Sequence, residues 1–332
     1  MNKNVTRMVC LVALAMGGVF PTLAAQPEPL VLEAKISLGE VRGRIDHLAI
    51  DVARQRLFDA ELGNGSVGVV DLKRGVLLRT ITGFREPQGV GYEEATDILY
   101  VADGGDGTVR LFHGADLKPA GQLTLGDDAD NLRTDSARHR VLVGYSSGAL
   151  AVIDTGSRHE VTRIPLKAHP EAFQLDHAGR LVYVNVPDAH EIAVVDLTLG
   201  RQVAGWTPSG MDANFPMAID EARRRVLVAF RQPATLGVFD QESGALLGSV
   251  AVCGDADDVF VDSKRDLIYV SCGEGFIEVL TAEGGSHVRT ARITTVVGAR
   301  TAMYSRDIDR LFLAVRATAT TPAAVWVFRP VP

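Results

Sequence analysis

LYVADGGDGTVRLFHG, residues 99–114, reads as two short apolar strands joined by a glycine-rich turn, and this pattern recurs seven times along the chain. A period in the low forties with four short strands per unit is typical of propeller blades. The sequence therefore predicts an all-β fold, a seven-bladed β-propeller. The repeat is marked by the residue that ends the first strand of each unit, at Asp51, Glu93, Asp135, Asp176, Asp220, Asp262 and Ser305.

The residue types support strands rather than helices. Helical repeats of similar length would place apolar residues three and four apart, whereas residues 149–154 (ALAVID) and 192–196 (IAVVD) are continuous β-rich runs. Each of these runs ends at an aspartate before a polar turn. We interpret that aspartate as a turn former.

The two ends of the repeat region predict how the ring closes. Residues 324–328 match the third strand of the other units and no fourth strand follows, whereas residues 30–38 (LVLEAKISL) precede the first full unit and resemble a fourth strand. We expect this N-terminal strand to complete blade seven, which removes an open sheet edge. No linker or break in composition interrupts the repeats, so residues 26–332 are expected to form a single domain.

Residues 1–25 differ from the repeats. Lys3 and Arg7 precede an apolar run over residues 8–20, and small residues follow at Ala24 and Ala25. This pattern predicts a secretory signal peptide cleaved near Ala24 or Ala25. The apolar run is too short to span a bilayer, so no transmembrane segment is expected. We expect a monomer in the periplasm or outside the cell, with a small molecule or an envelope protein as partner.

Charge and cysteine content fit this expectation. Loss of Lys3 and Arg7 changes the formal net charge from −7 to −9, which argues against nucleic acid as a partner. After cleavage only Cys253 and Cys272 remain, in an oxidising compartment. The blade pattern places them near the same rim, so they form either a disulfide or two separate buried thiols.

A functional site is expected at one mouth of the central channel, because the innermost strands of a propeller surround it. The residues four, five and seven positions before each mark differ between units, although the strands themselves repeat. A site needs different groups from different directions, whereas a scaffold can repeat one turn. The predicted ligand-binding residues are Arg44, Asp46, His47, Glu86, Gln88, Asp130, Asn131, His169, Glu171, Asp257, Asp258 and Arg300.

Several carboxylates around one cavity need a cation, a cationic ligand or raised pKa values to coexist. An oxygen-rich set suits Ca²⁺ or Mg²⁺, and a histidine admits Zn²⁺ or another transition metal. The candidate ligands of such a divalent metal are Asp128, Asp130, His169 and Glu171. The alternative is that these aspartates only form solvated turns.

Arginines near the same mouth suggest a different ligand. Arg44, Arg85 and Arg300 could hold an anion, because a guanidinium binds carboxylate or phosphate through two parallel hydrogen bonds; alternatively, each pairs with an acid of the ring. The loops between second and third strands are expected on this face too. They add the rim candidates Asp188, His190, Arg231, Glu274 and Arg316.

Residues 99–114, 182–197 (VYVNVPDAHEIAVVDL) and 268–280 (IYVSCGEGFIEVL) resemble the exported YVTN-type β-propeller family. The resemblance covers essentially all of the mature chain and implies the propeller fold. Related seven-bladed propellers include lactone hydrolases, lyases and modules that bind proteins or cofactors. The resemblance therefore implies no function and no catalytic residue, because the matching residues belong to strands and turns.

Three functions remain open at this stage. The first is an exported binding module whose channel mouth takes a small ligand, a metal or a protein partner. The second is a lactonase- or lyase-type enzyme in which a metal or Arg300 polarises a carbonyl and His47, His169 or Glu171 acts as general acid or base. The third is an envelope interaction surface with a merely solvated channel.

Overall fold

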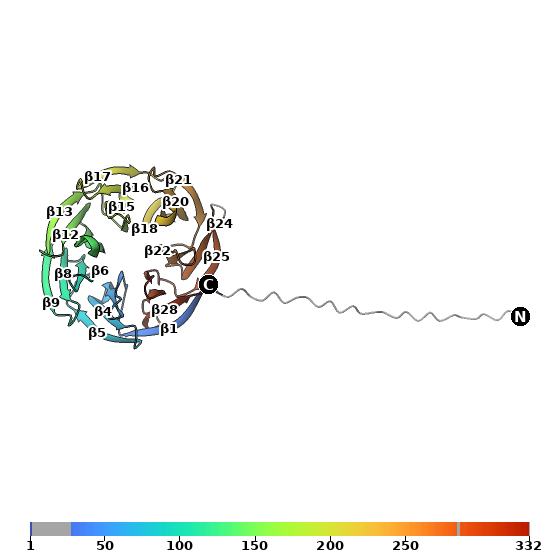
Figure 1. The fold of residues 1–332 in the computed structure, drawn as a ribbon. Helices are drawn as coiled ribbons and strands as arrows, with labels where there is room; N and C mark the ends of the chain where they lie inside the picture. The colour runs from blue at the N-terminus through green and yellow to red at the C-terminus, as the bar shows by residue number, and fades with distance from the viewer. Residues whose placement is uncertain (2–27, 284–285, 332) are drawn as a thin grey trace.

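The computed structural model describes residue 1, residues 28–283 and residues 286–331. Seven four-stranded antiparallel sheets form a ring around a central channel (Figure 1), which confirms the prediction of an all-β, seven-bladed β-propeller. The predicted signal peptide, including its cleavage site, lies outside the described residues apart from Met1.

The first three blades take up the chain between residues 48 and 165. Their strands are β2 (Leu48–Asp51), β3 (Arg56–Glu61), β4 (Ser66–Asp71), β5 (Val76–Thr82), β6 (Pro87–Glu93), β7 (Ile98–Asp103), β8 (Thr108–His113), β9 (Pro119–Thr124), β10 (Ala129–Asp135), β11 (Arg140–Tyr145), β12 (Ala149–Asp154) and β13 (His159–Pro165).

The next three blades extend to residue 294. Their strands are β14 (Phe173–Leu175), β15 (Leu181–Val186), β16 (Glu191–Asp196), β17 (Arg201–Trp206), β18 (Asp212–Asp220), β19 (Arg225–Gln232), β20 (Ala234–Asp240), β21 (Leu246–Ala251), β22 (Ala256–Asp262), β23 (Leu267–Cys272), β24 (Phe276–Glu283) and β25 (Ser286–Thr294). Short 3-10 turns, such as η3 (Pro187–Ala189), join some second and third strands.

The seventh blade combines both ends of the described chain. It contains β26 (Ala302–Ser305), β27 (Arg310–Val315), β28 (Ala323–Pro330) and β1 (Leu30–Gly39), in the sheet order β1-β28-β27-β26. β1 pairs antiparallel with β28, from Leu30 opposite Pro330 to Gly39 opposite Ala323. Both strands lie on the same side of the ring in Figure 1.

The second and third strands of the blades are buried on both faces, because each blade packs between two neighbours. In β3, Phe58 packs against blade two, in the same cluster as Val101. The adjacent Leu57 packs in another cluster with Ile36 and Phe312 of blade seven. Side chains alternate between the two faces of a strand, so a single strand contributes to two interblade cores.

Turn-forming aspartates end the third strands, as predicted from the sequence. One Oδ1 atom accepts a backbone hydrogen bond from the turn in each case, from Arg74 to Asp71 at 2.9 Å and from Ser157 to Asp154 at 2.7 Å. Asp196 does the same with two backbone N–H groups of its turn. These contacts are the Asx-turn geometry that makes aspartate favourable at such positions.

A disulfide joins Cys253 and Cys272, with the two Cα atoms 5.9 Å apart. Cys253 precedes β22 and Cys272 ends β23, so both are on the rim at which the innermost strands begin. Both side chains are buried. The bridge therefore joins the start of β22 to the end of β23, close in sequence to Asp255 and Asp257 at the channel mouth.

Candidate functional site

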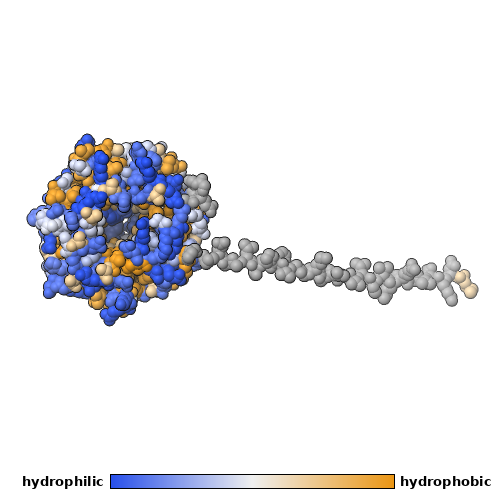
Figure 2. All heavy atoms as spheres, viewed as in Figure 1, coloured by the Kyte–Doolittle hydropathy of each residue, from blue (hydrophilic) through white to orange (hydrophobic). Residues whose placement is uncertain are grey.

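One mouth of the channel contains a cavity of about 190 Å³. In the space-filling view the centre of the ring is hollowed, and its rim is mostly hydrophilic (Figure 2). Every blade contributes to its lining, through residues at or just before the start of the innermost strand, with one exception from β19. The lining residues are Arg44, Gln88, Asp128, Asp130, His169, Glu171, Phe215, Arg231, Asp257 and Arg300.

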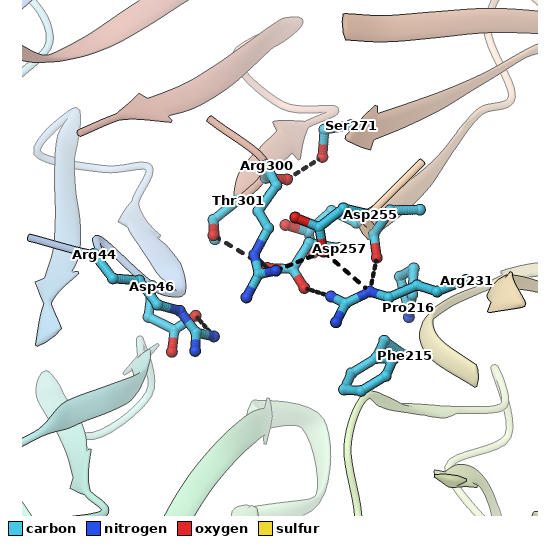
Figure 3. Close-up of polar contacts among 12 residues, drawn as sticks. Arg44, Asp46, Phe215, Pro216, Arg231, Asp255, Asp257, Ser271, Arg300 and Thr301 are labelled. Carbon is cyan, nitrogen blue, oxygen red and sulfur yellow. Dashed lines mark hydrogen bonds and ion pairs between the residues drawn. The ribbon is translucent and has the colours of Figure 1, made fainter. Parts of the chain in front are cut away.

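Two arginines lie side by side against two aspartates (Figure 3). Arg231 donates from Nη2 to Oδ1 of Asp257 at 2.5 Å, and its Nε lies 3.3 Å from Oδ1 of Asp255. Arg300 donates from Nη1 to Oδ1 of Asp255 at 2.6 Å, and its Nε lies 3.1 Å from Oδ2 of Asp257. Each carboxylate is thus shared by both guanidinium groups, which offsets their mutual repulsion.

The ring of Phe215 supports this pair, because its centroid lies 3.7 Å from Cζ of Arg231. A guanidinium stacked on an aromatic face is held in one plane and gains a cation–π attraction. Phe215 is the one apolar residue among the positions five residues before the repeat marks. Its contact with Arg231 gives it a role that the sequence did not indicate.

Arg44 lies apart from this pair, beside Asp46 (Figure 3), and donates from Nη2 to its Oδ1 at 2.9 Å. Asp46 is only 1% exposed. Burial raises the pKa of its carboxyl to about 6, although the charges of His47 and Arg44 oppose the shift. Asp46 therefore orients the guanidinium of Arg44 and does not itself line the cavity.

Each of the three arginines keeps one terminal nitrogen without a protein partner among the described residues. This is Nη1 in Arg44, Nη1 in Arg231 and Nη2 in Arg300. All three residues line the cavity. The mouth therefore offers several N–H donors to a ligand from fixed guanidinium planes.

His169 lies between two carboxylates. Its Nε2 is 3.5 Å from Oδ2 of Asp130, its Nδ1 is 3.5 Å from Oδ2 of Asp128, and Nδ1 also contacts the carbonyl oxygen of Ser146 at 2.6 Å. Burial by itself lowers the pKa of His169, but Asp130, the Ser146 carbonyl and Asp128 outweigh it and raise the pKa to about 9. His169 is therefore a cation at neutral pH, which does not suit it to act as a general base.

Glu171 lines the same cavity, two residues after His169 in the segment just before β14. Burial raises the pKa of its carboxyl to about 7; Asp130 and Asp257 add to the shift, whereas His169 and Arg231 oppose it. Glu171 can therefore gain and lose a proton near neutral pH. A pKa in this range suits a general acid or base.

The arrangement favours an ion-pair network over the metal site considered from the sequence. Asp128 and Asp130 both contact the imidazole of His169 rather than a common point with Glu171. Within residues 28–283 and 286–331, no three His, Cys, Asp or Glu side chains form a group that could hold one metal ion. The charges of the carboxylates are offset by Arg44, Arg231, Arg300 and His169 instead.

Several predicted residues lie outside this cavity. His47 and Asp258 line a different cavity deeper in the channel, because consecutive residues of an extended strand point in different directions. Asn131 is buried and accepts a hydrogen bond from Arg133. Glu86 is exposed, and its backbone N–H donates to Asp103. The structure therefore places these four predicted residues outside the mouth cavity.

Of the residues predicted on the loops between second and third strands, Arg231 lines the cavity. His190 pairs with Asp212 at 2.9 Å on the surface, and Glu274 accepts the backbone N–H of Gly254. Arg85 is exposed and bonds to Gly105. The other candidates that do not line the cavity are Asp188 and Arg316.

A serine motif lies in the turn beside His169. Residues 144–148 (GYSSG) match the GxSxG pattern of hydrolase nucleophile elbows. Here the segment is the hairpin turn between β11 and β12, not a strand-to-helix turn. His169 contacts the backbone oxygen of Ser146, not its hydroxyl. The motif therefore serves the site by placing a carbonyl against His169, with no nucleophile geometry.

Comparison with known proteins agrees on the fold. No family model and no curated protein match the sequence. A chain in the crystal structure of the mitotic checkpoint complex matches with a TM-score of 0.75 and 13% identity, over 98% of this chain and 99% of that chain. A chain of Kuenenia stuttgartiensis hydrazine synthase matches with a TM-score of 0.75 and 15% identity, over 87% and 97%.

At such low identity these likenesses show the seven-bladed β-propeller fold and nothing about activity. The described residues contain no helix that is long and apolar enough to cross a membrane.

Proposed function

We propose that this protein is an exported, YVTN-type β-propeller binding module whose channel mouth binds a small organic anion with one or two carboxylates. One observation carries the proposal. Arg44, Arg231 and Arg300 line the same cavity, and each has a terminal nitrogen without a hydrogen-bond partner among the described residues. Export rests on the signal-peptide pattern of residues 1–25.

Charge and size narrow the ligand class. The side chains of Arg231 and Arg300 are oriented by Asp255 and Asp257, so little rotamer entropy is lost when a carboxylate binds. The cavity of about 190 Å³ equals roughly six water volumes. A carboxylate of three to five carbons fits this space, with Phe215 beside its carbon chain.

Substitution of either paired arginine tests the site. We expect Arg231→Gln and Arg300→Gln each to weaken binding of succinate or glutarate at least tenfold, about 1.4 kcal/mol, because a charge-assisted hydrogen bond is lost. Isothermal titration calorimetry measures the change. Arg85→Gln is the matched control, because Arg85 is exposed and outside the cavity. Equal losses in all three variants, or no saturable binding of any C3–C5 carboxylate to the wild type, would contradict the proposal.

The titration of Glu171 predicts a pH dependence of binding. Its carboxyl, with a pKa raised to about 7 mainly by burial, becomes negative as the pH rises through that value. The added negative charge opposes an anionic ligand in the same cavity. We expect succinate affinity to fall about tenfold between pH 6.5 and 8.5 and to change much less in Glu171→Gln. An equal decline in both proteins would assign the effect to another group.

Glu171 also supports a second candidate function, hydrolysis of a lactone. Its carboxylate would take a proton from the attacking water while Arg231 or Arg300 donates to the carbonyl oxygen. A panel of lactones tested with wild type and Glu171→Gln separates the two functions. Turnover that Glu171→Gln abolishes supports the enzyme, and absence of turnover across the panel supports the binding module.

A further inference from the structure

We propose that the channel contains a second binding site, below the mouth, for a molecule with an apolar body and a carboxylate head, with Arg133 as the partner of the head. This site is separate from the one proposed above. It is a cavity of about 320 Å³, and none of its lining residues lines the mouth cavity. The innermost strands of six blades surround it.

Arg133 lies on β10 and lines this cavity. Its Nη1 donates to Asn131 Oδ1 and to the carbonyl oxygen of Leu132, and its Cζ lies 5.5 Å from the ring centroid of Phe173. Its Nε and Nη2 have no partner among the described residues. These two nitrogens form the edge of a guanidinium that binds a carboxylate through two parallel hydrogen bonds.

No carboxylate of the described residues forms an ion pair with Arg133, although the charges of Asp258 and Asp130 act on it from a distance. Asp258 lines the same cavity, but its Oδ2 accepts the backbone N–H of Ala302 at 2.7 Å, and it forms no ion pair with Arg133 among the described residues. Burial and the charge of Asp257 raise the pKa of Asp258 well above its usual value, although the Ala302 hydrogen bond and the charge of Arg133 oppose the shift. Asp258 is therefore a weak counter-charge for Arg133. A largely buried cation without a paired anion is costly, and a ligand carboxylate would remove that cost.

The rest of the cavity suits an apolar body. Phe260 and Met303 line the cavity at positions of their inner strands equivalent to that of Arg133. Ile50, Tyr92 and Tyr304 also line it, one position further along their strands and so further from the mouth. Tyr92 and Tyr304 also line two wider cavities, of about 630 and 500 Å³, that open on the face opposite the mouth. A ligand can therefore enter from that face, with its carboxylate inward and its apolar end against the aromatic side chains.

The probe for this site is 3-phenylpropionate, with its neutral amide as the matched compound. Calorimetry on the full-length mature protein should show binding of the acid and at least tenfold weaker binding of the amide. Arg133→Gln should remove this preference, whereas Arg231→Gln at the mouth should leave it unchanged. Because Arg133→Gln also changes the hydrogen bond to Asn131, Arg133→Lys provides a second test. It keeps the charge, loses the two-nitrogen edge, and should weaken acid binding severalfold.

Phe260→Ala tests the apolar half and should weaken the acid and the amide by similar factors. Two results would overturn the proposal: no saturable binding of 3-phenylpropionate to the wild type, or binding that Arg231→Gln abolishes and Arg133→Gln leaves intact. The second result would place the probe at the mouth and support the first site instead. The two proposals therefore succeed or fail separately.

Discussion

Deletion of residues 26–39 is expected to unfold the ring under conditions in which the full mature chain is folded. The deletion removes β1, which pairs along its length with β28. It also removes Leu30, Ile36 and Leu38, which are at most 3% exposed. Burial of three such side chains contributes roughly 6 kcal/mol, which is comparable with the whole stability of a typical domain. The exposed edge of β28 would in addition invite aggregation.

Circular dichroism melts and size-exclusion chromatography measure this effect. Two point variants on the same strand make a matched comparison. Leu30→Asn should lower the melting temperature by several degrees, whereas Leu32→Asn should leave it nearly unchanged, because Leu32 is 39% exposed. A truncated chain that melts at the wild-type temperature as a monomer would show that the ring does not need β1.

The fold was predictable because each blade repeats its own turn chemistry. Asp71, Asp154 and Asp196 occupy equivalent positions, and each accepts backbone hydrogen bonds from its turn. The repeat period and these turns place every innermost strand without tertiary information. The residues that begin those strands could therefore be assigned to one mouth of the channel.

Side-chain direction at the mouth was less predictable. Asp46 and His47 are adjacent in sequence, yet Asp46 supports Arg44 while His47 lines the lower cavity. The repeat gives the position of a residue along the strand, but the local twist decides which residue of a pair points to the mouth. The same limit explains why Arg133, five positions beyond Asp128 on the same inner segment, was not considered from the sequence.

The sequence raised the alternative that the arginines pair with acids of the ring, but it could not predict which acid each arginine contacts. Arg231 reaches Asp257 across 26 residues, and Arg300 reaches Asp255 across 45 residues. Whether an arginine in such a ring binds a ligand or a neighbouring acid depends on distances of a few ångströms between blades. The raised pKa of Glu171 likewise depends on burial between blades, which composition and spacing do not reveal.

A second large effect is expected at Asp59, in the middle of β3. The residue is fully buried, and neither carboxyl oxygen has a hydrogen-bond partner among the described residues. Gly68 on the neighbouring strand leaves room for Asp59, since a Cβ atom at position 68 would clash with its Oδ2. Burial, with a smaller contribution from Glu61, raises the pKa of Asp59 well above its usual value. The folded protein therefore keeps a proton on this carboxyl.

That proton makes stability depend on pH. Above the ordinary aspartate pKa of about 3.9, the unfolded chain releases the proton while the folded chain retains it, so the folded state binds more protons. The contribution of Asp59 to stability is then fully present below that pH and is lost as the pH rises through the raised pKa of the folded state. Asp59→Asn removes this titration, so its advantage over the wild type should grow with pH.

Thermal melts between pH 4 and pH 8.5 measure the difference. Asp59→Asn should be close to the wild type at pH 4 and more stable by about 2 kcal/mol at pH 8, a rise of roughly 4 °C. Asp59→Leu has a similar shape without unpaired polar atoms and should gain about 3 kcal/mol. Asp188→Asn, at an exposed position, is the control and should shift neither curve. If Asp59→Asn instead lost stability equally at both pH values, a partner of Asp59 would have to exist, and its carboxylate would be a structural anion rather than a buried acid.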